Sequence, residues 1–202
     1  MQSNDGPRFN LTIGTAPVKF VWFRVAKCGT RSTLKLLREH VTSFELEQGF
    51  NKRFPRKKLL DHKKFSIVRD PYTRIVSGWN DKVLLKNPGF YDVTDLQLEK
   101  MCNFGYFVDW LVDQNPREVN NHFKRQSLLV PRDVSLIGRI ERYEQDLRTI
   151  LQKVGFQDVG EIPHSNKKNA PNQASLMTPR VIRLLNDYYE RDFQRFGYTA
   201  KA

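Results

Sequence analysis

The chain has 202 residues and a hydrophobic content of 39%, which suits one domain of ordinary size with a substantial core. Its 34 basic and 22 acidic residues give a formal net charge of +12, which favours an anionic substrate, a nucleic acid or an acidic polymer as partner. No apolar run reaches the roughly 18 residues of a membrane span, and two cysteines, Cys28 and Cys102, are too few for a disulfide framework. We therefore expect a soluble, cytosolic protein, unless an N-terminal anchor precedes this sequence.

Residues 18–38 predict a buried strand, a basic loop and the start of a helix in direct succession. A β-branched and aromatic run from Val18 to Val25 indicates the strand, and the small residues and glycine of 26–30 indicate the loop. The first N–H groups of a helix have no internal partner and carry the positive end of its dipole, so they attract anions. Cations and hydroxyls at this junction predict a cradle for a phosphate-like group: Lys27, Thr30, Arg31, Ser32 and Thr33. The alternative is an ordinary strand-to-helix turn with capping hydroxyls. The nucleotide-triphosphatase P-loop fits poorly, because its lysine comes late in the loop.

Residues 64–83 predict a second junction of the same kind. Lys64 to Arg69 has the composition of a buried strand, Asp70 is a suitable N-cap and Pro71 a suitable first helical residue. Ser77 falls off the apolar stripe of the predicted helix and is therefore available to a ligand. The stripe itself consists of Tyr72, Ile75, Val76, Trp79 and Val83.

The remaining pattern alternates strands with helices and contains no internal repeat. It predicts, in chain order, a short strand at 41–46, an irregular basic stretch at 48–58, a loop at 86–94, helices at 96–101 and 104–112, a strand at 134–140, a helix at 143–154, a basic loop at 162–175 and a final helix from Thr178 to Gly197. Trp79 and Trp110 fall on apolar stripes and are expected in the core. This alternation favours an α/β fold of three layers with a mostly parallel central sheet flanked by helices. We expect an N-terminal extension at 1–17 and a single domain at 18–198.

Two junctions with cations and hydroxyls suit a ligand with two separated anionic groups, bound beyond the carboxyl ends of the strands. An early Lys-x-x-x-[Thr/Ser] loop followed by Arg-Asp-Pro-x-x-Arg-x-x-Ser closely resembles the two nucleotide-binding motifs of sulfotransferases that use 3′-phosphoadenosine 5′-phosphosulfate (PAPS). The resemblance is closest to the carbohydrate branch that includes the chondroitin and dermatan enzymes, where the second motif is similar to residues 68–77. Residues 122–126, 137–141 and 192–198 also resemble blocks of that branch. The resemblance implies a P-loop-like fold.

The resemblance also implies roles for individual residues. Arg69 and Ser77 would bind the 3′-phosphate, and an arginine suits this because its bonds to phosphate are charge-assisted and can be bidentate. The 5′-phosphosulfate would lie on the first loop, at Lys27, Cys28, Gly29, Thr30, Arg31, Ser32 and Thr33. Two residues depart from the family pattern: Ala26 stands where many relatives have proline, and Arg31 where they have a small residue.

The implied reaction is an in-line displacement that depends on positioning and electrostatics, with Lys27 stabilising the departing phosphate of 3′,5′-ADP. A base must take the proton of the acceptor hydroxyl, which we expect on a sugar that could itself be anionic. A histidine suits this role at neutral pH, and we select His122 first and His62 second. Glu45 or Glu47 could serve instead. Because the histidines and cysteines have no metal-ligand spacing, no metal is expected.

Other interpretations of the sequence stay open at this stage. The charge of +12 also suits a nucleic-acid-binding protein or a nucleotide-binding protein without sulfotransferase activity, although no nucleic-acid-binding motif is present. A kinase-like phosphotransferase would need a Walker lysine and an acidic metal ligand in other places. Lys167 and Lys168 belong either to a loop that closes over the nucleotide or to a solvated surface loop. If an anchor precedes the chain, the Golgi lumen replaces the cytosol as the expected compartment.

Overall fold

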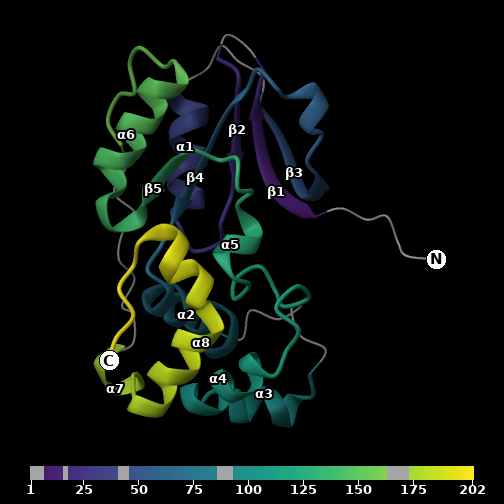
Figure 1. Ribbon diagram of the computed structural model, residues 1–202, viewed down its shortest axis with the longest axis vertical. Helices are drawn as coiled ribbons and strands as arrows, with labels where there is room; N and C mark the ends of the chain where they lie inside the picture. The colour runs from purple at the N-terminus through teal and green to yellow at the C-terminus, as the bar shows by residue number, and fades with distance from the viewer. Residues whose placement is uncertain (1–6, 16–17, 41–45, 86–92, 163–172) are drawn as a thin grey trace, which may run out of the picture. The chain divides into compact units, whose positions relative to one another are not determined.

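The computed structural model describes residues 7–15, 18–40, 46–85, 93–162 and 173–202. These residues form two compact units (Figure 1). Unit 1 consists of Met1–Val68 and Leu129–Ser165, and unit 2 of Arg69–Leu128 and Asn166–Ala202.

Unit 1 is built on a five-stranded sheet in the order β3-β1-β2-β4-β5 (Figure 1). β2, β4 and β5 are parallel, whereas β1 is antiparallel to both of its neighbours. The strands are β1 Arg8–Gly14, β2 Phe20–Phe23, β3 Leu46–Arg53, β4 Lys63–Val68 and β5 Leu136–Arg139. The predicted α/β fold is confirmed, and its sheet is mixed.

β1 and β3 supply the antiparallel half of this sheet, and neither is among the strands predicted from the sequence. β1 lies within the residues assigned to an N-terminal extension, yet it pairs with β2 and buries Phe9, Leu11 and Ile13. β3 occupies residues expected to be irregular, and that expectation is wrong. β3 is an edge strand whose side chains are mostly exposed, so main-chain pairing with β1 defines it rather than an alternating apolar pattern. Residues 41–45, which include most of the strand expected at 41–46, lie outside the described residues.

β2 and β4 form the buried centre of unit 1, as their apolar composition predicts. All four residues of β2 are buried, and Trp22 stacks on Phe65 of β4 at a ring separation of 5.8 Å. Helix α1 (Thr30–His40) follows β2, and helix α6 (Tyr143–Val154) packs against β4 and β5. The 3-10 turns η1 (Arg56–Lys58) and η3 (Ile140–Arg142) precede β4 and α6.

Unit 2 is helical, and its core is built around helix α2. A π-helical turn, η2 (Asn80–Leu84), continues α2, whose predicted apolar stripe is fully buried. α8 is capped by Thr178 and ends at Gly197 in the left-handed conformation, as predicted. The helices are α2 Pro71–Trp79, α3 Asp95–Met101, α4 Phe104–Val112, α5 Gln126–Leu129, whose last residue belongs to unit 1, α7 Gln173–Leu176 and α8 Pro179–Phe196. Trp79 is buried and Trp110 packs against the same core. Among the described residues, no helix is long and apolar enough to cross a membrane.

Candidate functional site

The loop between β2 and α1 and the first turn of α1, residues 25–33, are together called the anion loop here. Two of its residues have positive φ, Lys27 at 70° and Gly29 at 75°. For a residue with a side chain this conformation is uncommon and tends to occur where a functional loop requires it. The two left-handed residues turn the chain sharply, so that α1 begins at Thr30, seven residues after β2 ends at Phe23.

Gly29 of the anion loop is in close contact with η3 and the start of α6. A Cβ atom at this position would lie 2.8 Å from Cε2 of Tyr143 and 3.0 Å from Cδ1 of Ile140. Both the positive φ and the available space therefore require glycine. The carbonyl oxygen of Gly29 accepts hydrogen bonds from the backbone N–H of Thr33 at 2.9 Å and from its hydroxyl at 3.1 Å. The Thr33 hydroxyl is also 2.7 Å from the hydroxyl of Tyr143.

The other predicted residues of the loop divide into those that shape it and those that reach its surface. The Thr30 hydroxyl donates to the carbonyl of Val25 at 3.2 Å, and Cys28 is buried, with its thiol 3.6 Å from the carbonyl of Ala26. Lys27 and Ser32 are partly exposed and Arg31 is exposed. The structure therefore brings Lys27, Arg31 and Ser32 to the surface around the start of α1, while Cys28, Thr30 and Thr33 bond within the protein.

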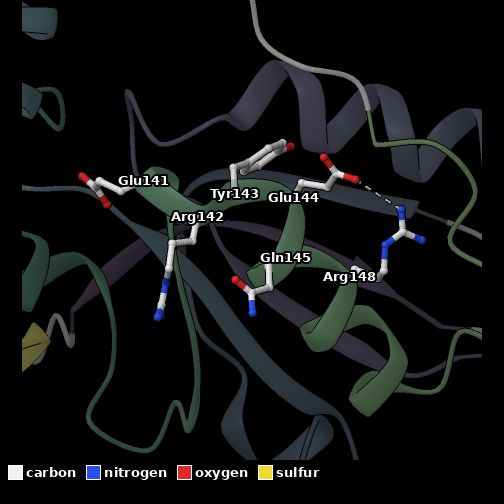
Figure 2. Close-up of a pocket in the computed structure, with 6 residues that line it drawn as sticks. All are labelled: Glu141, Arg142, Tyr143, Glu144, Gln145 and Arg148. Carbon is white, nitrogen blue, oxygen red and sulfur yellow. Dashed lines mark ion pairs between the residues drawn. The ribbon is translucent and has the colours of Figure 1, made fainter.

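A shallow hollow of about 360 Å³ lies at the start of α6, on the residues that follow β5. It is lined by Glu141, Arg142, Tyr143, Glu144, Gln145 and Arg148. Figure 2 shows the ring of Tyr143 pointing toward the purple ribbon of α1, whereas Arg142 and Gln145 point the other way. Burial raises the pKa of Tyr143 from 10.0 to about 12, against the lowering effect of its bond to Thr33, so its hydroxyl stays protonated at neutral pH.

In unit 2, the first turn of α2 positions the Arg69 side chain. The Asp70 carboxylate caps the helix by accepting from the Thr73 N–H at 2.8 Å. The Arg69 side chain donates from Nε to the Thr73 hydroxyl at 3.1 Å, which holds the guanidinium over this turn. Ser77 is half-buried and lies one turn further along the same face, because residues four apart are neighbours on a helix. We call Arg69, Thr73 and Ser77 the polar face of α2. The sequence pattern assigns no role to Thr73.

Gln126 fixes the main chain of Arg69. Its side-chain oxygen accepts from the Arg69 N–H at 2.9 Å, and its side-chain nitrogen donates to the Arg69 carbonyl at 2.8 Å. Gln126 is itself held by Asp192 of α8, whose carboxylate accepts from the N–H groups of Gln126 and Ser127 at 2.7 and 2.8 Å. Gln126 and Asp192 are completely buried. The sequence offers one signal for this clamp, an aspartate among the apolar residues of the α8 stripe.

Arg74, the second arginine of the Arg-Asp-Pro motif, has a structural role. Arg74 is 1% exposed, and its guanidinium donates to the carbonyls of Asn121 and Lys124 at 2.8 and 2.9 Å. These bonds hold residues 121–124 along α2. A buried arginine that satisfies two carbonyls is costly to replace, because both acceptors would be left without partners.

His122 lies beside the far end of α2, where its carbonyl oxygen approaches Gly78. Oδ1 of Asn120 accepts from the His122 backbone N–H at 2.9 Å and lies 2.8 Å from Nδ1 of the imidazole. An amide oxygen cannot donate, so Nδ1 carries the proton in the neutral ring and Nε2 is left as the proton acceptor. Nε2 lies 4.0 Å from the Asp81 carboxylate, which can stabilise the charged imidazolium.

His62, the second candidate base, lies at the N-terminal ends of the parallel strands, whereas Lys27 lies beyond their carboxyl ends. It precedes β4, and the next residue, Lys63, donates its N–H to the carbonyl of Lys19 ahead of β2. Because β2 and β4 are parallel, this end of the strands is opposite the end that carries Lys27. The His62 ring contacts Asp61, and hydrogen bonds from Lys19 and His62 lower the pKa of that carboxyl to about 2. The structure therefore does not bring His62 and Lys27 together.

The remaining sequence candidates contribute less to the site. Glu47 is exposed on β3, where it pairs with Ile13. Glu45, His164, Lys167 and Lys168 lie outside the described residues. No cluster of three or more potential metal ligands occurs in the part of the chain that the structure describes.

Comparison with known proteins gives consistent matches. The model of a family described as "Sulfotransferase family" matches residues 13–199. "Carbohydrate sulfotransferase 10" of Xenopus laevis is 30% identical over 167 residues, which cover 67% of this chain and 47% of the relative. The protein of the same name from Danio rerio is 28% identical, with 80% and 51% covered, and "Carbohydrate sulfotransferase 12" of Mus musculus is 24% identical, with 83% and 50% covered. The chain thus spans about half the length of these relatives. No solved structure gives a significant match. The nucleic-acid-binding alternative gains no support from these matches.

Proposed function

The chain belongs to the sulfotransferase family, and from this premise we propose that it transfers a sulfonate group from PAPS to a hydroxyl group of a carbohydrate. The observation that carries the proposal is the anion loop, in which Lys27 and Gly29 at positive φ lead directly into α1. Such a junction aims helix-start N–H groups and a lysine at one anion. The carbohydrate acceptor is suggested by the names of the relatives. The compartment, cytosol or Golgi lumen, stays a prediction.

The two ends of the nucleotide have separate sites in this proposal. The polar face of α2 binds the 3′-phosphate, with the guanidinium of Arg69 already aligned by Thr73 and the hydroxyl of Ser77 one turn along. The anion loop binds the 5′-phosphosulfate through Lys27, Arg31, Ser32 and the N–H groups that begin α1. Cys28, Thr30 and Thr33 contribute mainly through the shape of the loop, because their side chains bond within the protein.

In the transfer step the acceptor oxygen attacks sulfur, and the bond between sulfur and the bridging phosphate oxygen breaks. The ammonium group of Lys27 stabilises the charge that develops on the departing 5′-phosphate of 3′,5′-ADP. The acceptor proton goes to Nε2 of His122, and Asp81 stabilises the resulting imidazolium. Nine residues of helix, roughly 13 Å, separate Arg69 from the end of α2 beside His122. Such a separation fits a base that acts at the sulfonate while Arg69 holds the 3′-phosphate.

Calorimetry with 3′,5′-ADP tests the donor site. We expect micromolar binding to the native protein and a loss of about tenfold or more in Arg69→Ala, since hydrogen bonds to charged groups contribute about 1.5–3 kcal/mol. Arg183→Ala is the matched control, because Arg183 is an exposed arginine on α8 of the same unit. No binding of 3′,5′-ADP to the native protein would refute the donor assignment.

Turnover measurements test the base. His122→Ala should lower kcat by about 100-fold or more on any carbohydrate acceptor, because general-base catalysis typically contributes that much. The affinity for 3′,5′-ADP should be unchanged in this variant. Near-native kcat would remove His122 from the mechanism and leave the donor site intact.

A further inference from the structure

A hydrogen-bond chain joins α6 to the anion loop. The Thr33 hydroxyl donates to the Gly29 carbonyl at 3.1 Å. Its 2.7 Å contact with the Tyr143 hydroxyl can be donated by either oxygen, and when the Thr33 proton lies on the Gly29 carbonyl the donor is Tyr143. The resulting chain of donors runs from Tyr143 through Thr33 to the Gly29 carbonyl oxygen.

This chain fixes the peptide group at the very start of α1. In a trans peptide the carbonyl of Gly29 and the N–H of Thr30 point in opposite directions. The Gly29 carbonyl points into α1, where it also accepts the Thr33 N–H at 2.9 Å. The Thr30 N–H therefore points out of the helix start, toward the position of a bound anion.

The Tyr143 ring restrains the same peptide by contact. Its edge occupies the space where a Cβ of residue 29 would lie, 2.8 Å away. Tyr143 is 8% exposed, and burial keeps its hydroxyl protonated by raising its pKa to about 12. The phenol therefore keeps its proton at pH 10, where a free tyrosine is half ionised.

We propose that Tyr143 is a positioning residue for the donor's 5′-phosphosulfate: through Thr33 it orients the Gly29–Thr30 peptide so that the Thr30 N–H binds the anion. The inference rests on the proposed function, since it assigns the 5′ end of the nucleotide to this loop. Tyr143 follows the 137–141 block by two residues, and neither its residue type nor its spacing indicates contact with the loop.

Tyr143→Phe tests the proposal, because it keeps the ring and removes only the hydroxyl. We expect the dissociation constant of 3′,5′-ADP to rise about fivefold, the usual effect of losing one neutral hydrogen bond. Thr33→Val should weaken binding by a similar factor, and the double variant should be no weaker than Thr33→Val alone, because both act through one chain. The matched control is Tyr188→Phe in unit 2, whose buried hydroxyl has no hydrogen-bond partner among the described residues. That control should leave the affinity unchanged.

Ligand fragments separate positioning from general loss of structure. Chemical-shift titrations should show weaker binding of 5′-AMP to Tyr143→Phe and unchanged binding of 3′-AMP, with the reverse pattern in Arg69→Ala. A purely structural role would weaken both fragments together or lower only the melting temperature, and either result overturns the proposal. Native binding of 3′,5′-ADP with an unchanged constant in Tyr143→Phe also overturns it while sparing the proposed function. Absence of native binding would instead refute the proposed function itself.

Discussion

Replacing Gln126 by methionine removes a clamp while nearly preserving side-chain length. The native amide satisfies the N–H and the carbonyl of Arg69 at 2.9 and 2.8 Å, and Gln126 has no exposed surface. Each backbone group left without a partner costs about 1–3 kcal/mol when buried. Because Arg69 is half-buried and water can reach part of it, we expect Gln126→Met to lower the free energy of unfolding by about 2–3 kcal/mol. The same loss frees the Arg69 main chain, so 3′,5′-ADP binding should weaken as well.

Urea unfolding and calorimetry with 3′,5′-ADP measure the two effects on the same preparation. Gln194→Met is the matched control, because Gln194 is an exposed residue of α8 whose amide bonds to Glu190 at 3.0 Å. That control should change the free energy of unfolding by no more than about 0.5 kcal/mol. If Gln126→Met unfolds and binds like Gln194→Met, the clamp has no energetic role and the reasoning is wrong.

Three further outcomes follow from the contacts. Gly29→Ala should abolish detectable 3′,5′-ADP binding and lower the melting temperature. The new Cβ would lie 2.8 Å from the Tyr143 ring, and the φ of 75° is unfavourable for alanine. A melting temperature equal to the native one would contradict this. The free energy of unfolding should fall between pH 10 and 12, because the pKa of Tyr143 is raised from 10.0 to about 12 and the folded state keeps a proton that the unfolded state loses. Tyr143→Phe should reduce that fall by up to about 2 kcal/mol, and identical alkaline profiles would exclude the effect. Arg74→Met should lower the free energy of unfolding by about 3 kcal/mol, since it leaves the carbonyls of Asn121 and Lys124 without their donors. A decrease below about 1 kcal/mol in urea unfolding would show that water replaces the guanidinium as donor to these carbonyls.

The elements that could be predicted are those whose burial leaves a periodic or continuous apolar pattern. β2 and β4 are buried on both faces, and the α2 and α8 stripes have helical spacing with clear capping residues at Asp70 and Thr178. β3 could not be predicted, because an edge strand with exposed side chains is defined by main-chain pairing to β1, which is distant in sequence. β1 has the alternation typical of a strand at Phe9, Leu11 and Ile13 and could have been predicted from it.

The candidate site divides in the same way. Lys27 and Arg69 could be predicted as anion-binding residues because each cation stands at a strand-to-helix junction, which neighbouring residues in the sequence are enough to identify. His62 shows the limit of that approach. It is only seven residues from Arg69 in the sequence, but the six extended residues of β4 place it roughly 20 Å away, at the opposite end of the strand. Tyr143, Gln126 and Asp192 act through contacts between segments that are more than 50 residues apart, which no local pattern encodes.

Both junctions also share a physical requirement that explains these distant contacts. A helix start that binds an anion must hold several donors in fixed directions without a ligand, although their dipoles repel one another. A residue from another part of the same unit meets this requirement in each case: Tyr143 restrains the Gly29–Thr30 peptide in unit 1, and Gln126 restrains the Arg69 main chain in unit 2. In unit 1 the anchor acts on the Gly29 carbonyl through the Thr33 hydroxyl, and in unit 2 it bonds directly to the main chain of Arg69; each leaves the outward donors to the ligand. Substitutions at the two anchors should therefore weaken different ends of the same nucleotide, Tyr143→Phe the 5′ end and Gln126→Met the 3′ end. If both variants lose affinity for 5′-AMP and for 3′-AMP by equal factors, the two restraints are not separate.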